Sequence, residues 1–214
     1  MTDAPFSGVF KAGKDGRQPT FKTAAGIFAR KGYHGTTVDE IAQAVGVAKG
    51  TIYYHFKNKE DLYFAVIQEG INIFGKQLRD AAAAADSPHD KIRNLVDSHL
   101  DFYEKEQDLV FLFLKELTGS ELRRKILAGM LAECLAVVRE AITAGIKDGS
   151  FRSVNPELAT SSLFGMITIA AFHYLAFTRP IARAAVKSAV EEIFTRGILP
   201  AKEKGDCCCV AGNL

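Results

Sequence analysis

A run of hydrogen-bonding side chains from residue 49 to residue 59 is the part of this sequence whose residue types could do chemistry. It reads KGTIYYHFKNK and holds two adjacent tyrosines, three lysines, a threonine and a histidine. Such side chains can donate hydrogen bonds to phosphate oxygens and to base edges. Ile52 and Phe56 are four residues apart and would anchor one face of a helix to a core. The polar side chains would then form an exposed surface suited to nucleic acid.

The segments on either side of this run would hold it in place. Thr37 stands where a helix N-cap would, and Glu40 can complete a capping box, so a helix is expected from Val38. Gly46 supplies the permissive backbone at which that helix would end. A second helix is expected from Ala48 to about residue 56, and a third begins at residue 59. Two short helices joined by a tight turn are typical of a DNA-binding helix-turn-helix.

The ordered residues of this stretch resemble the N-terminal domain of TetR-type transcriptional regulators. The resemblance covers residues 19–67, and the run Thr-Ile-Tyr-Tyr-His-Phe-Lys-Asn-Lys makes it specific. Ala48 departs from it, since a serine or threonine cap is common there, and Gly26 replaces a helix former. The resemblance implies an all-α chain in which a DNA-binding domain precedes a helical domain for effector binding and dimerisation.

Each residue of the expected DNA surface is assigned a role. Lys49 and Thr51 are predicted to contact base edges, Gly50 to allow the close approach, and Tyr53 to touch a thymine methyl group. Half-buried packing is the alternative for Tyr53, which lies nearer the apolar stripe. Phosphate contacts are assigned to Thr37, Tyr54, His55 and Lys59.

The charge of the chain is nearly balanced. Its 214 residues carry a net charge of +2 and are 48% hydrophobic, which argues for globular order and against binding by bulk electrostatics. Residues 1–67 hold nine Lys or Arg and six Asp or Glu, a net charge of +3, which leaves −1 for the rest.

Residues 1–18 are expected to form a flexible arm, either following DNA or merely disordered. Without an apolar secretion segment there, a cytoplasmic location is expected.

The placement of the cysteines and the lack of catalytic motifs indicate that the protein is not an enzyme. Cys134 lies in an apolar helical run, and Cys207, Cys208 and Cys209 are consecutive in an expected tail over 201–214. Adjacent cysteines without a nearby histidine make a poor metal site, so neither a metal nor another cofactor is expected. Redox sensing by the triplet is the alternative. The sequence has no Gly-rich phosphate loop or nucleophile elbow.

The larger part of the chain, residues 68–200, follows a helical period. Apolar residues recur at spacings of three and four, which excludes strands. The stretch from Leu109 to Leu114 is apolar all round, so its helix is expected to be enclosed on every side. Helices are expected over residues 62–85, 88–105, 107–118, 120–148, 156–178 and 181–198.

A small-molecule cavity among these helices is implied by the resemblance. Apolar residues exceed what helix stripes need, and a few polar ones lie among them, which suggests a mainly hydrophobic effector, fatty acyl-like or aromatic. Plain core packing is the alternative reading for each residue. The candidates are His99, Phe102, Phe113, Leu117, Met130, Phe164, Thr168 and Phe172.

Residues 158–178 contain no Asp, Glu, Lys or Arg, so either a membrane span or a helix buried between two copies would fit them. The polar residues within this segment favour a homodimer and no membrane partner. A dimer would bind a palindromic double-stranded DNA operator, and effector binding would release it, as in a repressor. Small or interfacial residues expected at the dimer contact are Ser162, Gly165, Ile169, Ala185, Ser188 and Ala189.

Overall fold

The computed structural model describes residues 21–117, 119–177 and 183–199. Within these ranges every regular element is a helix, which confirms the all-α prediction. The expected N-terminal arm and the tail with its three cysteines lie outside the described residues.

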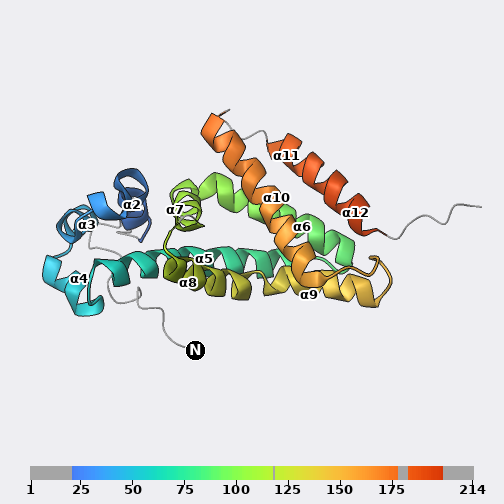
Figure 1. Cartoon of the computed structure of the whole chain (residues 1–214), viewed down its shortest axis with the longest axis horizontal. Helices are drawn as coiled ribbons and strands as arrows, with labels where there is room; N and C mark the ends of the chain where they lie inside the picture. Colours follow the sequence, from blue (N-terminus) through green and yellow to red (C-terminus); the bar gives the residue numbers. More distant parts are fainter. Residues whose placement is uncertain (1–20, 118, 178–182, 200–214) are drawn as a thin grey trace, which may run out of the picture.

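Three helices form a small N-terminal domain, seen at the left of Figure 1. They are α2 (Phe21–Gly35, interrupted at Gly32), α3 (Val38–Val45) and α4 (Lys49–His55). Phe28, Ile41 and Ile52, one from each helix, are almost completely buried and make the core of this domain. The helix-turn-helix was therefore predicted correctly.

The local signals that position α3 and α4 act as expected. The Glu40 amide donates to Thr37 Oγ1 at 3.2 Å, and the Thr37 amide donates back to Glu40 Oε2 at 3.1 Å. Gly46 then ends α3 with a left-handed backbone (φ 77°, ψ 30°), which a residue with a Cβ would adopt only at a cost. Ala48 precedes α4 and makes no side-chain cap.

A long helix, α5 (Lys59–Ala83), runs from the small domain into the larger one (Figure 1). It is continuous through residue 67, so the two expected domains share one helix. The helices that complete the larger domain are α6 (Pro88–Lys105), α7 (Gln107–Leu117), α8 (Glu121–Cys134), α9 (Ala136–Lys147), α10 (Pro156–Phe177), α11 (Arg183–Val190), the π-helical turn η1 (Glu191–Thr195) and α12 (Arg196–Ile198).

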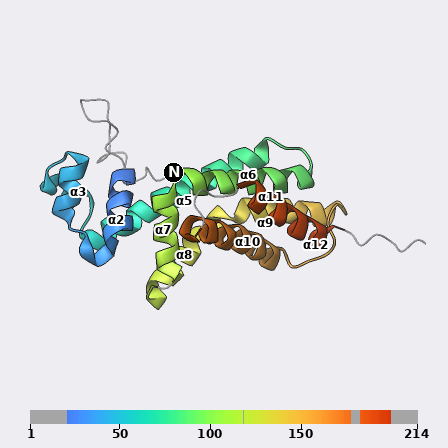
Figure 2. The ribbon, with the colours of Figure 1, turned by 90° about the horizontal axis from the view of Figure 1, so that it is seen from above.

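The larger domain is a layered bundle around α5 and α6. Helices α8 and α9 follow α5, while α10 crosses α6 and α9 with α11 at its side (Figures 1 and 2). Ion pairs fasten α11 to α6: Arg183 contacts Asp97, Asp101 and Glu104, and Lys187 donates to Asp97 at 2.6 Å. Helices α6 and α11 are thus joined by ion pairs as well as by apolar packing.

The single helix expected over residues 120–148 is two helices that meet at Leu135 (φ −84°, ψ −1°). Neither Gly nor Pro occurs at this break, so local propensity did not reveal it. Both helices pack on α5, and the turn at Leu135 lets each keep that contact.

The apolar run in α7 predicted a helix enclosed on every side, and this prediction was wrong. Phe111 is 47% exposed, and Lys115 Nζ lies 5.0 Å from the centre of its ring. The α7 helix also packs closely on α2, and the same Lys115 ammonium donates to the Ala29 carbonyl at 3.0 Å. A Cβ added at Gly26 would lie 2.9 Å from Asp108 Oδ2, so this glycine permits the close approach of α7.

Candidate functional site

The outward face of α4 presents the aromatic and polar side chains that the sequence indicated. Tyr54 is 85% exposed and Tyr53 is 46% exposed, whereas Ile52 on the inner face is buried. A Cβ built on Gly50 would meet nothing within 4 Å, so the surface above this residue is open. Thr51 and His55, on the same helix, are partly buried. The His55 ring contacts the Tyr54 ring edge-on, with the ring centres 5.0 Å apart. These residues share one face, as a recognition helix requires.

Lys49, at the start of α4, is held by a neighbouring helix. Its Nζ donates to Asp39 Oδ2 on α3 at 2.7 Å and lies 5.9 Å from the centre of the Tyr53 ring. The hydrogen bond to Asp39 raises the pKa of Lys49, so the ammonium keeps its charge. Both partners are exposed, and this pair can open when a base edge or phosphate competes for the lysine.

Lys59 occupies a different position from the one its phosphate assignment requires. Its Nζ donates to the carbonyl oxygens of Tyr33 and Thr36 at 2.8 and 2.9 Å, and it lies 4.5 Å from the centre of the Tyr33 ring. The ammonium therefore fastens the start of α5 to the end of α2. This geometry argues against a phosphate contact, and sequence reasoning missed it because the two carbonyls are more than twenty residues away along the chain.

Thr37 caps the start of α3 and is also exposed on the surface of the small domain. Its hydroxyl accepts from the Glu40 amide and donates to Glu40 Oε2 at 3.2 Å, while the residue remains exposed at the start of α3. Its phosphate contact stays a prediction.

Arg123 on α8 lies at the junction between the two domains. Its guanidinium carbon is 4.5 Å from the centre of the Tyr33 ring, and Nη2 donates to Glu60 Oε1 at 3.0 Å. It also lies 3.6 Å from Glu116 Oε1, which accepts a hydrogen bond from the Tyr63 hydroxyl at 2.7 Å. Burial, and then the bond to Glu116, raise the pKa of Tyr63, which stays protonated. One arginine of the larger domain thus contacts α2, the start of α5 and α7.

The interior of the larger domain is apolar around one histidine. The His99 ring on α6 lies 4.8 Å from the rings of Phe74 and Tyr103 and 5.2 Å from Phe164. Burial lowers the pKa of His99 to about 3, so the imidazole is neutral at physiological pH. Its Nε2 has no hydrogen-bond partner among the described residues. The Tyr103 hydroxyl, by contrast, bonds to Thr168 Oγ1 at 2.7 Å.

A small, partly enclosed cavity of about 10 Å³ lies beside His99, and it has room for a single water molecule. The described side chains around it are uncharged and come from α5, α6, the α8–α9 junction, α9 and α10. They are Leu78, Leu95, His99, Leu135, Val138, Thr160, Leu163, Phe164 and Ile167.

Two of the predicted effector residues, His99 and Phe164, line this cavity. Phe102, Phe113 and Thr168 are buried in the surrounding core. Met130 and Phe172 are only partly buried and do not line it. Leu117, the last residue of α7, is 47% exposed and does not line the cavity either. Thr160 was missed, although a polar residue in the charge-free segment 158–178 was a signal.

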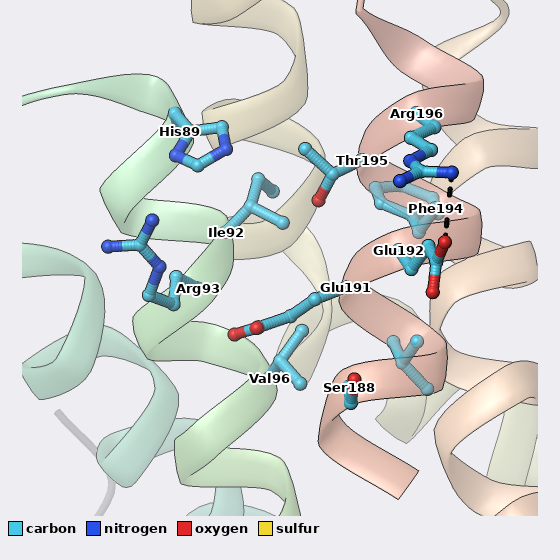
Figure 3. A pocket seen from close by; sticks show the side chains of 11 residues that line it. His89, Ile92, Arg93, Val96, Ser188, Glu191, Glu192, Phe194, Thr195 and Arg196 are labelled. Atoms are coloured by element: carbon cyan, nitrogen blue, oxygen red, sulfur yellow. Dashed lines mark ion pairs between the residues drawn. The ribbon is translucent and has the colours of Figure 1, made fainter. Parts of the chain in front are cut away.

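A second hollow, of about 400 Å³, opens between α6 and the C-terminal helices (Figure 3). Arg93 and Val96 face it from α6, and Glu191 points toward them from η1 (Figure 3). Glu192 is paired with Arg196 at 2.9 Å on its far side. The predicted effector residues lie elsewhere, so this cleft is separate from the interior cavity.

The residues predicted at a dimer contact lie on α10 and α11. Ile169 is 59% exposed, and Leu158 on α10 and Ile193 on η1 are also exposed apolar side chains. Ser162, Ala185, Ser188 and Ala189 are exposed and Gly165 is partly so. Among the described residues, none of the helices is both long enough and apolar enough to cross a bilayer. Within the same ranges, no cluster of His, Cys, Asp or Glu is arranged to hold a metal ion.

Comparison with known proteins connects both domains to one family. The family model described as bacterial regulatory proteins, tetR family, matches residues 21–66, and the tetracyclin repressor-like C-terminal domain matches residues 85–172. The chain is 32% identical to the HTH-type transcriptional repressor KstR2 of Rhodococcus jostii, covering 69% of this chain and 74% of the repressor. It is 28% identical to the fatty acid metabolism regulator protein of Bacillus subtilis, covering 82% and 91% of the two chains.

A solved structure gives the same result. The fatty acid degradation regulator FadR from Bacillus halodurans superposes with a TM-score of 0.76 at 25% identity, covering 83% of this chain and 96% of that one. The helix-turn-helix, the helical body and these relatives agree, and the chain belongs to the TetR family of transcriptional regulators.

Proposed function

We propose that this protein is a cytoplasmic repressor that binds a palindromic DNA operator as a homodimer and is released by a small, mainly hydrophobic effector. The observation that carries the DNA-binding half of the proposal is the face of α4. Tyr54 is exposed beside Tyr53, Lys49 and the open backbone at Gly50, a costly arrangement for a surface without a partner. Each of these groups suits contact with phosphates or base edges.

The continuous α5 helix supports coupling between effector and DNA. Leu78 lines the interior cavity, and Tyr63 on the same helix packs against Phe28 in the small domain with ring centres 4.9 Å apart. Fifteen residues of helix separate them, about 22 Å. A ligand that shifts α5 at Leu78 would therefore move the base of the small domain. Such coupling requires the ligand to prefer the non-binding arrangement, typically by about 1–3 kcal/mol.

The character of the effector follows from the interior. The cavity walls are aliphatic and aromatic apart from His99 and Thr160, which fits an apolar molecule. The name of the Bacillus subtilis relative, a regulator of fatty acid metabolism, agrees with a fatty acyl-like compound. The volume of about 10 Å³ means that wall side chains must move apart when a ligand enters.

The DNA-binding role can be tested by replacing Tyr54, whose exposed side chain does little for the fold. We expect Tyr54→Ala to reduce affinity for an operator about tenfold or more, since a phosphate contact and an aromatic contact are lost, with thermal stability unchanged. Fluorescence anisotropy with labelled duplex DNA measures this. The matched control is Tyr103→Phe, which removes a hydroxyl inside the larger domain, where it bonds to Thr168. An operator affinity unaffected by Tyr54→Ala would contradict the assignment of this face.

A further inference from the structure

Two residues that line the interior cavity each carry a buried polar atom without a hydrogen-bond partner among the described residues. His99 Nε2 on α6 and Thr160 Oγ1 on α10 both lack a hydrogen bond within the described part of the chain. Both residues are at least nine-tenths buried, and both line the same cavity. Buried polar groups are nearly always hydrogen-bonded, so this unpaired couple indicates a polar occupant: a water molecule in the free protein, or a polar group of a ligand that displaces it.

The surroundings of the cavity restrict the charge of that occupant. Among the described residues that line it there is no Lys, Arg, Asp or Glu, and the neutral His99 supplies no counter-ion. The neighbouring Tyr103 hydroxyl and Thr168 hydroxyl bond to each other. A carboxylate or ammonium placed here would be buried without an opposite charge, which is far more costly than burying a neutral polar group.

The two free atoms also define the type of hydrogen bond. A neutral imidazole can donate or accept at Nε2 according to its tautomer, and a threonine hydroxyl can do both. Together they can satisfy a hydroxyl, or donate to a carbonyl oxygen. We infer that the effector carries an uncharged hydrogen-bonding group, such as a hydroxyl, a ketone or an ester, within an otherwise apolar molecule, and that His99 and Thr160 select it.

This inference rests on the proposed function, because it names the ligand class of the same cavity. For a fatty acyl-like effector it has a definite consequence. The cavity would accept the chain as an ester, a thioester or an alcohol and would discriminate against the free acid, whose carboxylate finds no partner among the lining residues.

A set of eight-carbon probes separates these possibilities on the full-length protein. Octan-1-ol, methyl octanoate, octanoate, octylammonium and octane share one chain and differ in the end group. By isothermal titration or native mass spectrometry, we expect the two neutral polar probes to bind at least roughly tenfold more tightly than either ion.

Two variants assign the preference to the named side chains. Thr160→Val keeps the side-chain shape and removes the hydroxyl, and His99→Phe keeps a ring and removes both nitrogens. Each should reduce the ratio of octan-1-ol to octane affinity by roughly tenfold while octane still binds. Thr143→Val is the matched control, because the Thr143 hydroxyl donates to the Arg139 carbonyl at 2.7 Å and does not line the cavity.

Different results would contradict this inference and the proposed hydrophobic effector. Octanoate binding as tightly as octan-1-ol, or an unchanged alcohol-to-octane ratio in Thr160→Val, would overturn the inference and leave a hydrophobic effector possible. Failure of every probe to bind, octane included, would contradict the hydrophobic effector itself and the inference with it.

Discussion

Lys49 and Lys59 both carry positive charge near the α4 surface, and their partners set different roles for them. Lys49 is paired with an exposed carboxylate of Asp39, a contact that costs little to break. Lys59 is bound to two backbone carbonyls and covers the Tyr33 ring. A lysine in such an exposed ion pair can reach DNA, whereas a lysine bound to partly buried carbonyls stabilises the domain that carries the recognition helix.

Replacing Lys59 tests this division of roles. Lys59→Ala should lower the free energy of unfolding by about 2 kcal/mol, since hydrogen bonds from a charged group to two carbonyls are lost. The slope of log K against log salt for DNA binding should stay unchanged. Urea denaturation and salt titrations provide both values, with the exposed Lys57→Ala as the control. A slope reduced by about one in Lys59→Ala, with stability intact, would show a phosphate contact instead.

His99 should make stability depend on pH. Burial lowers its pKa in the folded state to about 3, below the usual value of 6.5. Between these values the unfolded chain binds a proton that the folded chain does not, so stability rises with pH across this window and falls as pH drops below 6.5. The loss attributable to His99 between pH 7 and pH 5 is about 2 kcal/mol.

His99→Phe isolates this contribution. Its unfolding free energy should change less between pH 7 and pH 5 than that of the wild type, by about 2 kcal/mol. Denaturant titrations of both proteins at the two pH values measure this difference. The contributions of the other ionisable groups are shared by the two proteins and cancel. Equal pH dependence in the two proteins would mean that His99 titrates normally in the folded state.

At the scale of helices, the sequence predicted the elements that depend on local chemistry. The Thr37 capping box and the Gly46 turn need only neighbouring residues, and both occur as expected. The break at Leu135 and the exposure of Phe111 depend on contacts with other helices, which the helical period does not reveal. The same holds for the cavity, whose walls come from four helices and the junction at Leu135. His99 and Phe164 were foreseen there, and Thr160 was not.

The α8 helix is expected to hold the small domain in place through Arg123. In Arg123→Met the ion pair with Glu60 and the contact with the Tyr33 ring are lost while most of the side-chain stem remains. We expect faster hydrogen exchange in α2 and unchanged exchange in α6, because local opening follows lost contacts. Mass-spectrometric hydrogen exchange measures both. Arg124→Met is the matched control, since the Arg124 guanidinium donates to the nearby Gly119 carbonyl at 2.7 Å. Unaltered exchange in α2 would remove Arg123 from the junction.

For the whole molecule, the α4 face and the proposed dimer contact lie at different ends of the structure. The α4 face lies at one end, and the exposed Ile169 and Ile193 lie on α10 and η1 of the larger domain (Figures 1 and 2). In a homodimer paired through those helices, the recognition helix α4 of each chain would stay uncovered, because it lies far from α10 and α11. In a helix-turn-helix dimer the two recognition helices enter successive major grooves, about 34 Å apart.

Selection of random duplex DNA on the purified protein tests this arrangement most directly, followed by measurement of the mass of the complex on the enriched site. The protein should select a palindrome and bind it as an even number of chains, and Ile169→Glu, which places a charge at the expected contact, should bind it much more weakly. Selection of no sequence, or tight binding of one chain to a single half-site unaffected by Ile169→Glu, would contradict an operator-binding dimer.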